Sequence, residues 1–398
     1  MKIVFIAPFG IRPKGTVLAR MVPLAAELQG LGHEVVIIAP PYTNPEDSGK
    51  TEIVRGVRIR NVRLARGGRA LAAPALAWRM LRATHGEKPD LVHLFKPKGY
   101  GGLAVMLHSL LQRNTPLFVD TDDWEGRGGM ETLHDYSLME RQLYRLQEQW
   151  LPSRAVGVTV ASRMLETLVR GMGVPEERLL YLPNCVDDIP VGDGAAVRRR
   201  LGIPGAAPVV LLYTRFFEFS QEKLHAVFAE LARTVPGVRF LVVGKGRNRE
   251  EDLLVAAARK NGFADSLTVA GWVEPKELPD WLAVGDVALY PFSDTLVNRA
   301  KCPAKLTELM RAGVPVVADR VGEIAEYVVS GESGVLCDPN DWSEMSLLVA
   351  ELLATPHLRQ KIGATGRHRI LTNFAWQGAA ERLNGFYSAL IEKGTITR

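Results

Sequence analysis

Short apolar runs recur along the whole chain and alternate with longer segments of helical periodicity. In the first half, five such runs cover 2–8, 33–40, 89–95, 116–122 and 155–162. Each run is too uniformly apolar for a strand with one face in water, so each predicts a strand buried on both faces of a parallel sheet. Because helical segments separate the runs, we expect the first half to form a doubly wound α/β domain.

The second half repeats this pattern, with apolar runs at 207–214, 238–244, 265–271, 286–291 and 314–319. The stretch between the two series is rich in Pro, Gly and Asp, which is typical of an interdomain linker. The alternation therefore predicts an α/β protein made of two Rossmann-like, doubly wound domains that face a central cleft.

The change of pattern gives the domain boundaries. We expect a first domain over 1–186, a linker over 187–206 and a second domain over 207–375. Residues 376–398 carry apolar positions at helical spacing and predict a terminal helix. A chain of 398 residues exceeds one comfortable hydrophobic core, which agrees with two domains.

The composition is that of an ordinary globular protein, with 47% hydrophobic and 23% charged residues. The three cysteines lie far apart and lack the spacing of a metal site, so we expect small core residues in a reducing compartment. The N-terminus enters a strand directly, and no apolar run approaches the length of a membrane span. We therefore expect a cytoplasmic protein.

Positive charge is concentrated in one segment. Eight arginines and no carboxylate lie between Arg55 and Arg82, with an apolar stretch over 70–83, although the net charge is only +5. Such a block can bind anionic lipid headgroups or nucleic acid, or it can be a solvated basic face. We expect no nucleic acid partner. A peripheral contact of Arg55–Arg82 with the inner face of a membrane and a plain solvated face both stay open.

Unusual residues follow the predicted strands of the second half. Arg215 follows the first of these strands, Gly244 follows the second, and Trp272 follows the third. The segment KCPAKLTEL (301–309) comes after the fourth. Ligands of open α/β sheets bind at the carboxyl ends of the strands, where these residues would meet. Glycine turns, cations and a carboxylate at one sheet edge suit a nucleotide diphosphate.

The last of these segments predicts a helix that begins near Pro303, since proline is tolerated in the first helical turn. Lys305 near this helix start favours phosphate binding, because the free amides and the helix dipole attract the same charge. Glu308, one turn later, could accept a pair of ribose hydroxyls. The alternative is that Lys305 and Glu308 form an ordinary surface pair.

Several motifs carry a family resemblance: YTR (213–215), VVGKG (242–246), VAGWV (269–273) and PAKLTELMRAGVPVVA (303–318). They resemble those of family 4 glycosyltransferases of the GT-B fold, and the likeness runs nearly from end to end. LPNCVD (182–187) is similar to the hinge signature of that family. The resemblance implies transfer of a sugar from a nucleotide-diphosphate donor to an acceptor hydroxyl, usually with retention and without a metal or other cofactor. The first domain would bind a glycan or lipid-linked acceptor, and the terminal helix would pack back toward it.

The resemblance also implies residue roles. Arg215 would hold the diphosphate, the backbone near Trp272 and Val273 would meet the base, Glu308 would bind the ribose, and Gly10 would contact the donor from the first domain. Many relatives carry Lys-Gly five residues after the arginine, where this chain has Ser-Gln, so Lys223 is the nearest substitute. The expected donor-binding set is Gly10, Arg215, Lys223, Gly244, Trp272, Val273, Lys305, Leu306, Thr307 and Glu308.

The chain also departs from the family pattern. Relatives commonly carry two glutamates with seven residues between them. Glu308 matches the second, whereas the first position is Ala300, so the sugar-binding acid of the family is either absent or replaced by Asp294 or Asn298. Relatives often have His-Asp after the strand that reads PLFVDTD here, and this chain has Asp122 at the histidine position. We expect Asp122 to orient the transferred sugar or the acceptor, and Asp122 and Arg215 to form the catalytic set.

Other interpretations stay open. The triplet DTD (120–122) could hold a divalent cation, could bind sugar or acceptor hydroxyls, or could be a structural turn. His93 at a strand end is more often structural than functional. A nucleotide-sugar 2-epimerase and a non-catalytic nucleotide-sugar binder are alternatives on the same architecture. A dehydrogenase is disfavoured, because the loop APFGIRPKG (7–15) lacks Gly-x-Gly-x-x-Gly.

Overall fold

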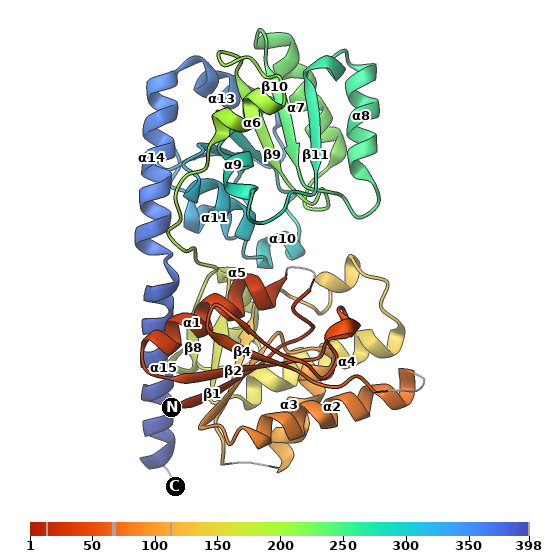
Figure 1. The fold of residues 1–398 in the computed structure, drawn as a ribbon, viewed down its shortest axis with the longest axis vertical. Coiled ribbons are helices and arrows are strands. Elements are labelled where there is room, and N and C mark those ends of the chain that lie inside the picture. Colours follow the sequence, from red (N-terminus) through yellow and green to blue (C-terminus); the bar gives the residue numbers. More distant parts are fainter. Residues whose placement is uncertain (13–14, 66–68, 112–113, 397–398) are drawn as a thin grey trace. The chain divides into compact units, whose positions relative to one another are not determined.

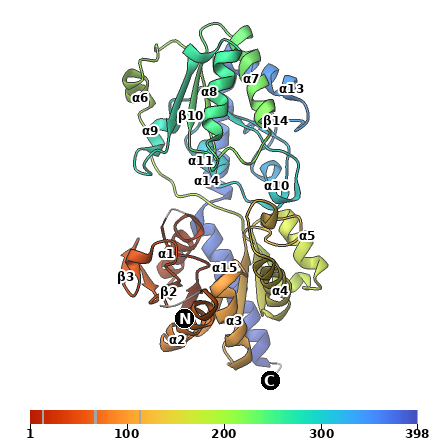
Figure 2. The ribbon, with the colours of Figure 1, turned by 90° about the vertical axis from the view of Figure 1, so that its right-hand side faces the viewer.

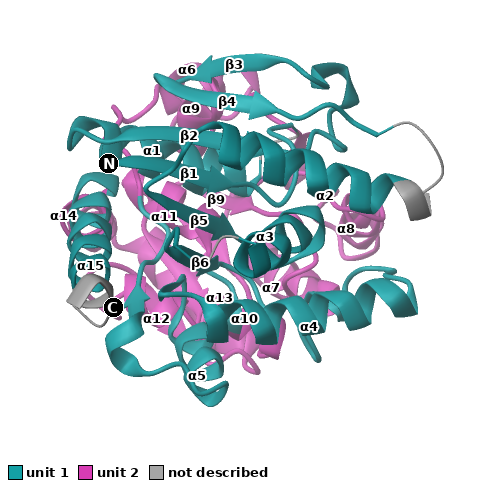
Figure 3. Cartoon of the chain, turned by 90° about the horizontal axis from the view of Figure 1, so that it is seen from below, with its two compact units in different colours: residues 1–185, 300–302, 376–398 teal, residues 186–299, 303–375 magenta. Residues whose placement is uncertain are grey.

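The computed structural model describes residues 1–12, 15–65, 69–111 and 114–396. The chain divides into two compact units, coloured separately in Figure 3. Unit 1 contains residues 1–185, 300–302 and 376–398, and unit 2 contains residues 186–299 and 303–375. Each unit is built around one sheet, so the prediction of two doubly wound α/β domains is confirmed.

Unit 1 holds an eight-stranded sheet in the order β3-β4-β2-β1-β5-β6-β7-β8, of which β1, β2, β4 and β8 are labelled in Figure 1. All neighbouring strands pair in parallel except β3 and β4. The five predicted strands are β1 (Lys2–Ile6), β2 (Glu34–Ala39), β5 (Leu91–Phe95), β6 (Leu117–Thr121) and β7 (Gly157–Val160). Three strands were not predicted: β3 (Thr51–Val54), β4 (Val57–Asn61) and β8 (Leu179–Tyr181). These three lie at the two ends of the sheet.

Helices cover both faces of this sheet. They are α1 (Val22–Gly30), α2 (Arg69–Gly86), α3 (Gly99–Leu111), α4 (Leu138–Arg154), α5 (Arg163–Gly171) and α15 (Trp376–Ile396). Helices α2, α3 and α4 pack in series, while α15 packs against α1 (Figure 3). A π-helical turn precedes α1. Residues 376–398 thus belong to unit 1, where the resemblance placed the terminal helix.

Unit 2 holds a six-stranded parallel sheet in the order β11-β10-β9-β12-β13-β14. The predicted strands are β9 (Val209–Tyr213), β10 (Arg239–Val243), β11 (Leu267–Gly271), β12 (Val287–Tyr290) and β13 (Val316–Asp319). The short strand β14 (Val335–Cys337) was not predicted. The strand order reverses between β9 and β12, and in unit 1 between β1 and β5. In doubly wound sheets ligands bind at such reversals, outside the carboxyl ends of the strands.

The helices of unit 2 are α6 (Gly194–Arg200), α7 (Gln221–Thr234), α8 (Glu250–Lys260), α9 (Leu278–Leu282), α11 (Ala304–Arg311), α12 (Ile324–Tyr327), α13 (Trp342–Ala354) and α14 (Pro356–Asn373). Helix α10 (Leu296–Ala300) begins in unit 2, and its last residue belongs to unit 1. Helices α7, α8 and α13 lie side by side (Figure 2), and α11 packs against α14 and β13. Short 3-10 turns occupy Pro45–Asp47, Met130–Thr132, Glu176–Arg178 and Ala264–Ser266.

Local sequence explains where several helices begin. Ser137 forms a capping box with Glu140 at the start of α4. The side chains of Ser162, Ser220 and Asp341 accept backbone N–H bonds at the starts of α5, α7 and α13. Each cap satisfies amides that lack a partner inside the helix. These caps therefore fix the loop before α5 at the carboxyl edge of the sheet in unit 1. They fix the loop before α7 at the carboxyl edge of the sheet in unit 2.

The segment 187–206, expected as a linker, lies within unit 2. It contains α6, which packs against α9. The Arg198 guanidinium donates to the carbonyl of Val284 at 2.7 Å and to the Asp286 carboxylate at 2.8 Å. Val186 forms an isolated parallel bridge with Ala375. Unit 2 therefore begins about twenty residues earlier than its composition indicates.

The basic block is partly neutralised within unit 1. Arg58 lies 2.8 Å and Arg60 3.4 Å from the buried carboxylate of Glu87. Arg79 donates to the carbonyls of Arg63 and Leu64, and Arg66 lies outside the described residues. Among the helices of the described ranges, none combines the length and the hydropathy that a bilayer crossing requires. Membrane contact by Arg55–Arg82 stays a prediction.

Candidate active site

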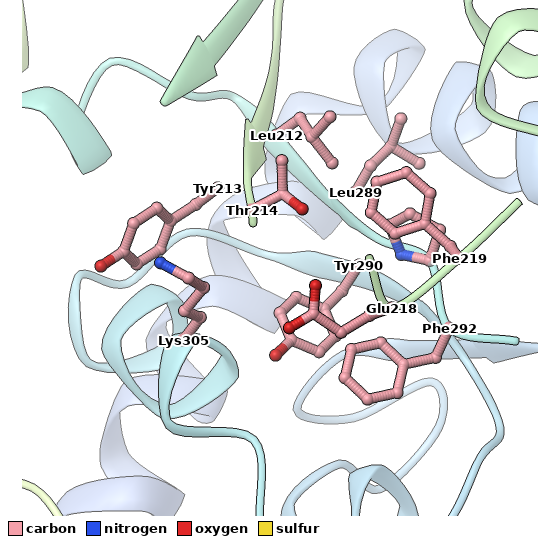
Figure 4. Close-up of a pocket in the computed structure, with 10 residues that line it drawn as sticks. Leu212, Tyr213, Thr214, Glu218, Phe219, Leu289, Tyr290, Phe292 and Lys305 are labelled. Atoms are coloured by element: carbon pink, nitrogen blue, oxygen red, sulfur yellow. The ribbon is translucent and has the colours of Figure 1, made fainter. Parts of the chain in front are cut away.

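A small pocket lies where the strand order of unit 2 reverses. Its walls come from the carboxyl ends of β9 and β12, the loop after β9, and the first turn of α11 (Figure 4). The residues that line it are Leu212, Tyr213, Thr214, Glu218, Phe219, Leu289, Tyr290, Pro291, Phe292 and Lys305. An apolar floor therefore carries a few polar groups at the position where a doubly wound sheet binds ligands.

The loop after β9 makes a tight turn between two charged side chains, Arg215 and Glu218. Phe216 has a φ of 69°, a left-handed conformation that is rare for a bulky residue. Its N–H donates to the Thr214 hydroxyl at 2.7 Å, and its carbonyl accepts from the Gln221 side chain at 2.9 Å. This turn leaves Arg215 exposed, while the nearly buried Glu218 lines the pocket. Backbone strain of this kind often marks a functional loop.

Helix α11 brings Lys305 and Glu308 to the same place. The Lys305 ammonium lies 3.5 Å from the centroid of the Tyr213 ring. The Tyr213 hydroxyl donates to Glu308 Oε2 at 2.9 Å. Leu306 and Thr307, between them, are buried, and the Thr307 hydroxyl donates to the carbonyl of Ala304 at 2.8 Å. Of the expected residues on α11, Lys305 thus lines the pocket, Glu308 is bonded to the lining residue Tyr213, and the other two pack inward.

A second group of charged residues lies at the carboxyl edge of the sheet in unit 1. Lys96 follows β5 directly, and its ammonium contacts the Asp123 carboxylate and lies 3.3 Å from Asp122 Oδ1. The Thr16 hydroxyl donates to Asp122 Oδ2 at 3.0 Å. Burial raises the pKa of Asp122 to about 6, against the opposing charge of Lys96. This edge can therefore hold a carboxylate that changes protonation just below neutral pH.

Asp120, two residues earlier, has a different environment. Its carboxylate accepts from the buried Arg20 guanidinium at 2.9 and 2.6 Å and from the Thr159 hydroxyl at 2.5 Å. His93 contacts the Tyr387 hydroxyl at 2.5 Å in the core, where burial lowers the pKa of the imidazole to about 3. Asp120 and His93 are therefore structural. Within the described residues no three His, Cys, Asp or Glu side chains are grouped to hold a metal.

Two family models together match most of the chain. Residues 15–185 match the glycosyl transferase 4-like domain, and residues 207–355 match the glycosyl transferases group 1 domain. The chain belongs to the group 1 glycosyltransferases. The resemblance read from its motifs is thereby confirmed.

Curated relatives of this glycosyltransferase are named as sugar-transferring enzymes. It is 24% identical over 389 residues to a glycogen synthase of Mycobacterium tuberculosis, covering 92% of this chain and 89% of the relative. It is 31% identical over 233 residues to a GDP-mannose-dependent mannosyltransferase of Mycolicibacterium smegmatis, covering 57% of this chain and 60% of that one. The glycosyltransferase is thus an enzyme that uses a nucleotide-sugar donor. The epimerase and non-catalytic alternatives find no support among these relatives.

Solved structures confirm the GT-B fold. Sucrose-phosphate synthase from Thermosynechococcus elongatus superimposes with a TM-score of 0.78 at 20% identity, covering 99% of this chain and 100% of that one. HepE from Anabaena, solved with UDP and glucose, superimposes with a TM-score of 0.75 at 18% identity, covering 98% and 100%. Identities this low establish the architecture of the glycosyltransferase alone.

Two expected donor ligands of the glycosyltransferase have structural partners instead. The Lys223 ammonium lies 2.6 Å from the buried Asp319 carboxylate and donates to the Pro339 carbonyl at 2.8 Å. The Gly244 N–H donates to the Gly271 carbonyl at 2.8 Å. Lys223 and the Gly244 amide thus have partners within unit 2, and their roles as donor ligands stay predictions.

The conformation at Gly244 nevertheless requires glycine. Its φ is 123°, and a Cβ there would lie 1.9 Å from the Thr214 carbonyl oxygen. Trp272, after β11, is 61% exposed, and Val273 is half-buried. In unit 1, Gly10 is buried, and a Cβ there would meet Asn44 Oδ1 at 1.6 Å. The glycines at both sheet edges thus permit close approach of neighbouring chain segments.

The proposed substitutes for the missing family glutamate are also engaged elsewhere. Asn298 donates to the carbonyls of Glu218 at 2.6 Å and Ser293 at 2.8 Å. Asp294 pairs with Arg299 at 2.6 Å, and Ala300 is fully buried in the core of unit 1. Neither Asp294 nor Asn298 lines the pocket, and whether the acid is absent or replaced by one of them stays a prediction.

The sequence reasoning missed three residues at these sites. Glu218 is a carboxylate in the pocket, Tyr213 contacts Lys305 and Glu308 of α11, and Lys96 pairs with Asp122. One signal was available for Glu218, which is the lone acid in the apolar stretch FFEF (216–219). Tyr213 stands in the motif YTR (213–215), but no local pattern points to its partners or marks Lys96, since these partners lie far away in the chain.

Proposed function

We propose that the enzyme transfers a sugar with retention from a nucleoside-diphosphate donor to an acceptor hydroxyl, and that it handles the diphosphate with protein groups rather than a metal. The observation that carries this proposal is the pocket at the strand reversal of unit 2, with Lys305 in its wall at the start of α11. Arg215 adjoins a lining residue and is exposed to solvent. The relative named as GDP-mannose-dependent and the HepE complex with UDP support a nucleotide donor.

The proposed chemistry follows from where charge develops. The anomeric carbon–oxygen bond to the phosphate breaks, and its electron pair leaves with the nucleoside diphosphate. The acceptor oxygen bonds to that carbon, and its proton passes to the departing diphosphate oxygen, so the products are the glycoside and the protonated nucleoside diphosphate. Arg215, Lys305 and the first amides of α11 stabilise the charge that grows on the diphosphate. Asp122 in unit 1 orients the transferred sugar or the acceptor, which is a glycan or a lipid-linked sugar.

Metal independence gives a direct test. The two outer carboxylates of the triplet DTD already face Arg20 and Lys96, so their charge is matched by protein cations. We expect turnover in excess EDTA to stay within about twofold of the untreated rate, because no step needs a Lewis acid. A loss of turnover that Mg²⁺ or Mn²⁺ restores would overturn the metal-free proposal.

The ribose gives a second test. In Glu308→Gln the carboxylate becomes a neutral amide of the same shape, so a charge-assisted hydrogen bond is weakened. We expect the donor KM to rise by about tenfold, with a small change in kcat. Initial rates at varied donor concentration measure this effect. The 2′,3′-dideoxy nucleotide is the control, and it should bind the wild type and the variant equally. Equal ribo- and dideoxynucleotide affinity in the wild type would show that Glu308 does not touch the ribose.

A further inference from the structure

Tyr213 joins Lys305, which lines the pocket, to Glu308, which follows one helical turn later on α11. It ends β9, the first strand of unit 2, whereas its two partners lie more than ninety residues later in the chain. Its ring lies under the Lys305 ammonium at 3.5 Å, and its hydroxyl donates to Glu308 at 2.9 Å. Figure 4 shows Tyr213 and Lys305 on one side of the pocket. One aromatic side chain thus sets the positions of a cation and a carboxylate one helical turn apart.

Each contact restrains a flexible group. A lysine side chain loses considerable rotamer entropy when it is fixed, and the cation–π contact supplies part of that order before any ligand binds. The hydrogen bond to Glu308 Oε2 sets the plane in which the carboxylate accepts further bonds. Burial raises the pKa of the Tyr213 hydroxyl, so it stays protonated and keeps donating across the neutral range.

We propose that Tyr213 is a positioning residue that makes the enzyme select ribonucleoside over 2′-deoxyribonucleoside diphosphate donors. This inference rests on the proposed function, since it assigns Glu308 to the ribose and Lys305 to the diphosphate. A carboxylate held by Tyr213 in one orientation matches one arrangement of vicinal hydroxyls. A donor without the 2′-hydroxyl leaves that orientation unsatisfied, and a site built around a hydroxyl rejects the analogue that lacks it.

The geometry separates two effects of Tyr213, and two substitutions isolate them. Tyr213→Phe removes the hydrogen bond to Glu308 but keeps the ring under Lys305. Tyr213→Leu removes both the hydrogen bond and the aromatic face. The probes are UDP or GDP, whichever binds the wild type more tightly, the matching 2′-deoxynucleotide, and inorganic pyrophosphate, which carries no ribose. Dissociation constants come from titration calorimetry.

We expect the wild type to bind the ribonucleotide at least about tenfold more tightly than its deoxy analogue, the scale of one buried unsatisfied acceptor. Tyr213→Phe should reduce this preference to about twofold and leave the pyrophosphate affinity unchanged, because the cation–π contact remains. Tyr213→Leu should also weaken pyrophosphate by severalfold, at about the scale of one such contact. A merely structural role would weaken all three probes together.

Several outcomes would overturn the proposal. An unchanged ribose preference in Tyr213→Phe would do so, as would a preference that survives in Glu308→Ala. Tyr213→Phe in a Glu308→Gln background should have little further effect on the preference, since the two residues act through one bond. A wild type that binds a nucleotide without ribose preference refutes this inference alone. A wild type that binds no nucleoside diphosphate refutes the proposed function.

Discussion

Arg215→Ala should lower kcat/KM, and the fall should correspond to a loss of about 2–4 kcal/mol of transition-state stabilisation. This is the usual scale for losing one preorganised donor to a developing charge. Arg215 follows β9, and the left-handed turn at Phe216 directs the chain so that the guanidinium stays exposed beside the pocket. Burial raises the pKa values of Tyr213 and Tyr290, and the charge of Arg215 opposes this in both. The charge of Arg215 therefore acts on two of the aromatic residues that line the pocket, Tyr213 and Tyr290.

Steady-state kinetics with a matched set of variants tests this prediction. Arg215→Lys keeps the charge but loses the bidentate geometry, so it should recover only part of the rate. Arg233→Ala removes an exposed arginine that pairs with Glu230 on α7 and should leave kcat/KM unchanged. Wild-type kcat/KM in Arg215→Ala would remove this residue from the diphosphate site.

Asp122→Asn should slow turnover by about a hundredfold and leave nucleotide affinity nearly unchanged, because the residue orients a substrate in unit 1 rather than the diphosphate. The carboxylate is held by Lys96 and Thr16, so its position is fixed before substrate arrives. Its pKa is raised to about 6, chiefly by burial. The ionised form therefore predominates above that pH and is lost as the pH falls through it.

The pH profile supplies a second readout for Asp122. In the wild type, kcat/KM should fall on the acid side of about pH 6, because Asp122 takes up a proton there and loses its charge. In Asp122→Asn the remaining activity should lack this acid limb. Asp135→Asn, at an exposed carboxylate in the same unit, is the control. A hundredfold loss with an intact acid limb would mean that a different group titrates.

The fold was largely predictable, because a strand buried on both faces has a sequence pattern of its own. The runs that became β1 or β9 are uniformly apolar and unambiguous. The strands that were missed carry weaker signals. The burial of β3 alternates between exposed and intermediate, and β8 and β14 have three residues each. Short strands at or near a sheet edge have too few buried positions to show a period.

The site was predictable only where one segment carries the chemistry. Arg215, Lys305 and Glu308 stand at strand ends and a helix start, so their placement follows from local pattern. The ion pair of Lys223 could not be predicted, because its partner Asp319 lies 96 residues away in the chain. The pairing of Lys96 with the Asp122 segment likewise depends on the neighbouring positions of β5 and β6. Such partners are set by sheet order, which the apolar pattern alone does not specify.

The chain leaves unit 1 after residue 185 and returns to it twice, at residues 300–302 and 376–398. These returns restrict which segments two related glycosyltransferases can exchange. Two segments from the second half belong to unit 1, and they are held differently. At residues 300–302 the Ser162 hydroxyl donates to the Ala300 carbonyl. The Asn184 side chain donates to the Cys302 carbonyl, and the Asn184 backbone N–H donates to the Cys302 sulfur. Backbone carbonyls are present in any sequence, but Ala300 is buried in the core of unit 1, so this crossing should accept a foreign segment that keeps a small apolar residue there.

Helix α15 is held by side chains instead, through His93 to Tyr387 and His33 to Asn384. A chimera with one crossover near residue 186 would pair α1 and β5 of one parent with the last helix of the other. Two crossovers, near 186 and near 375, keep these partners together. Exchange of the donor-binding half among relatives should therefore succeed as an insertion between two retained ends.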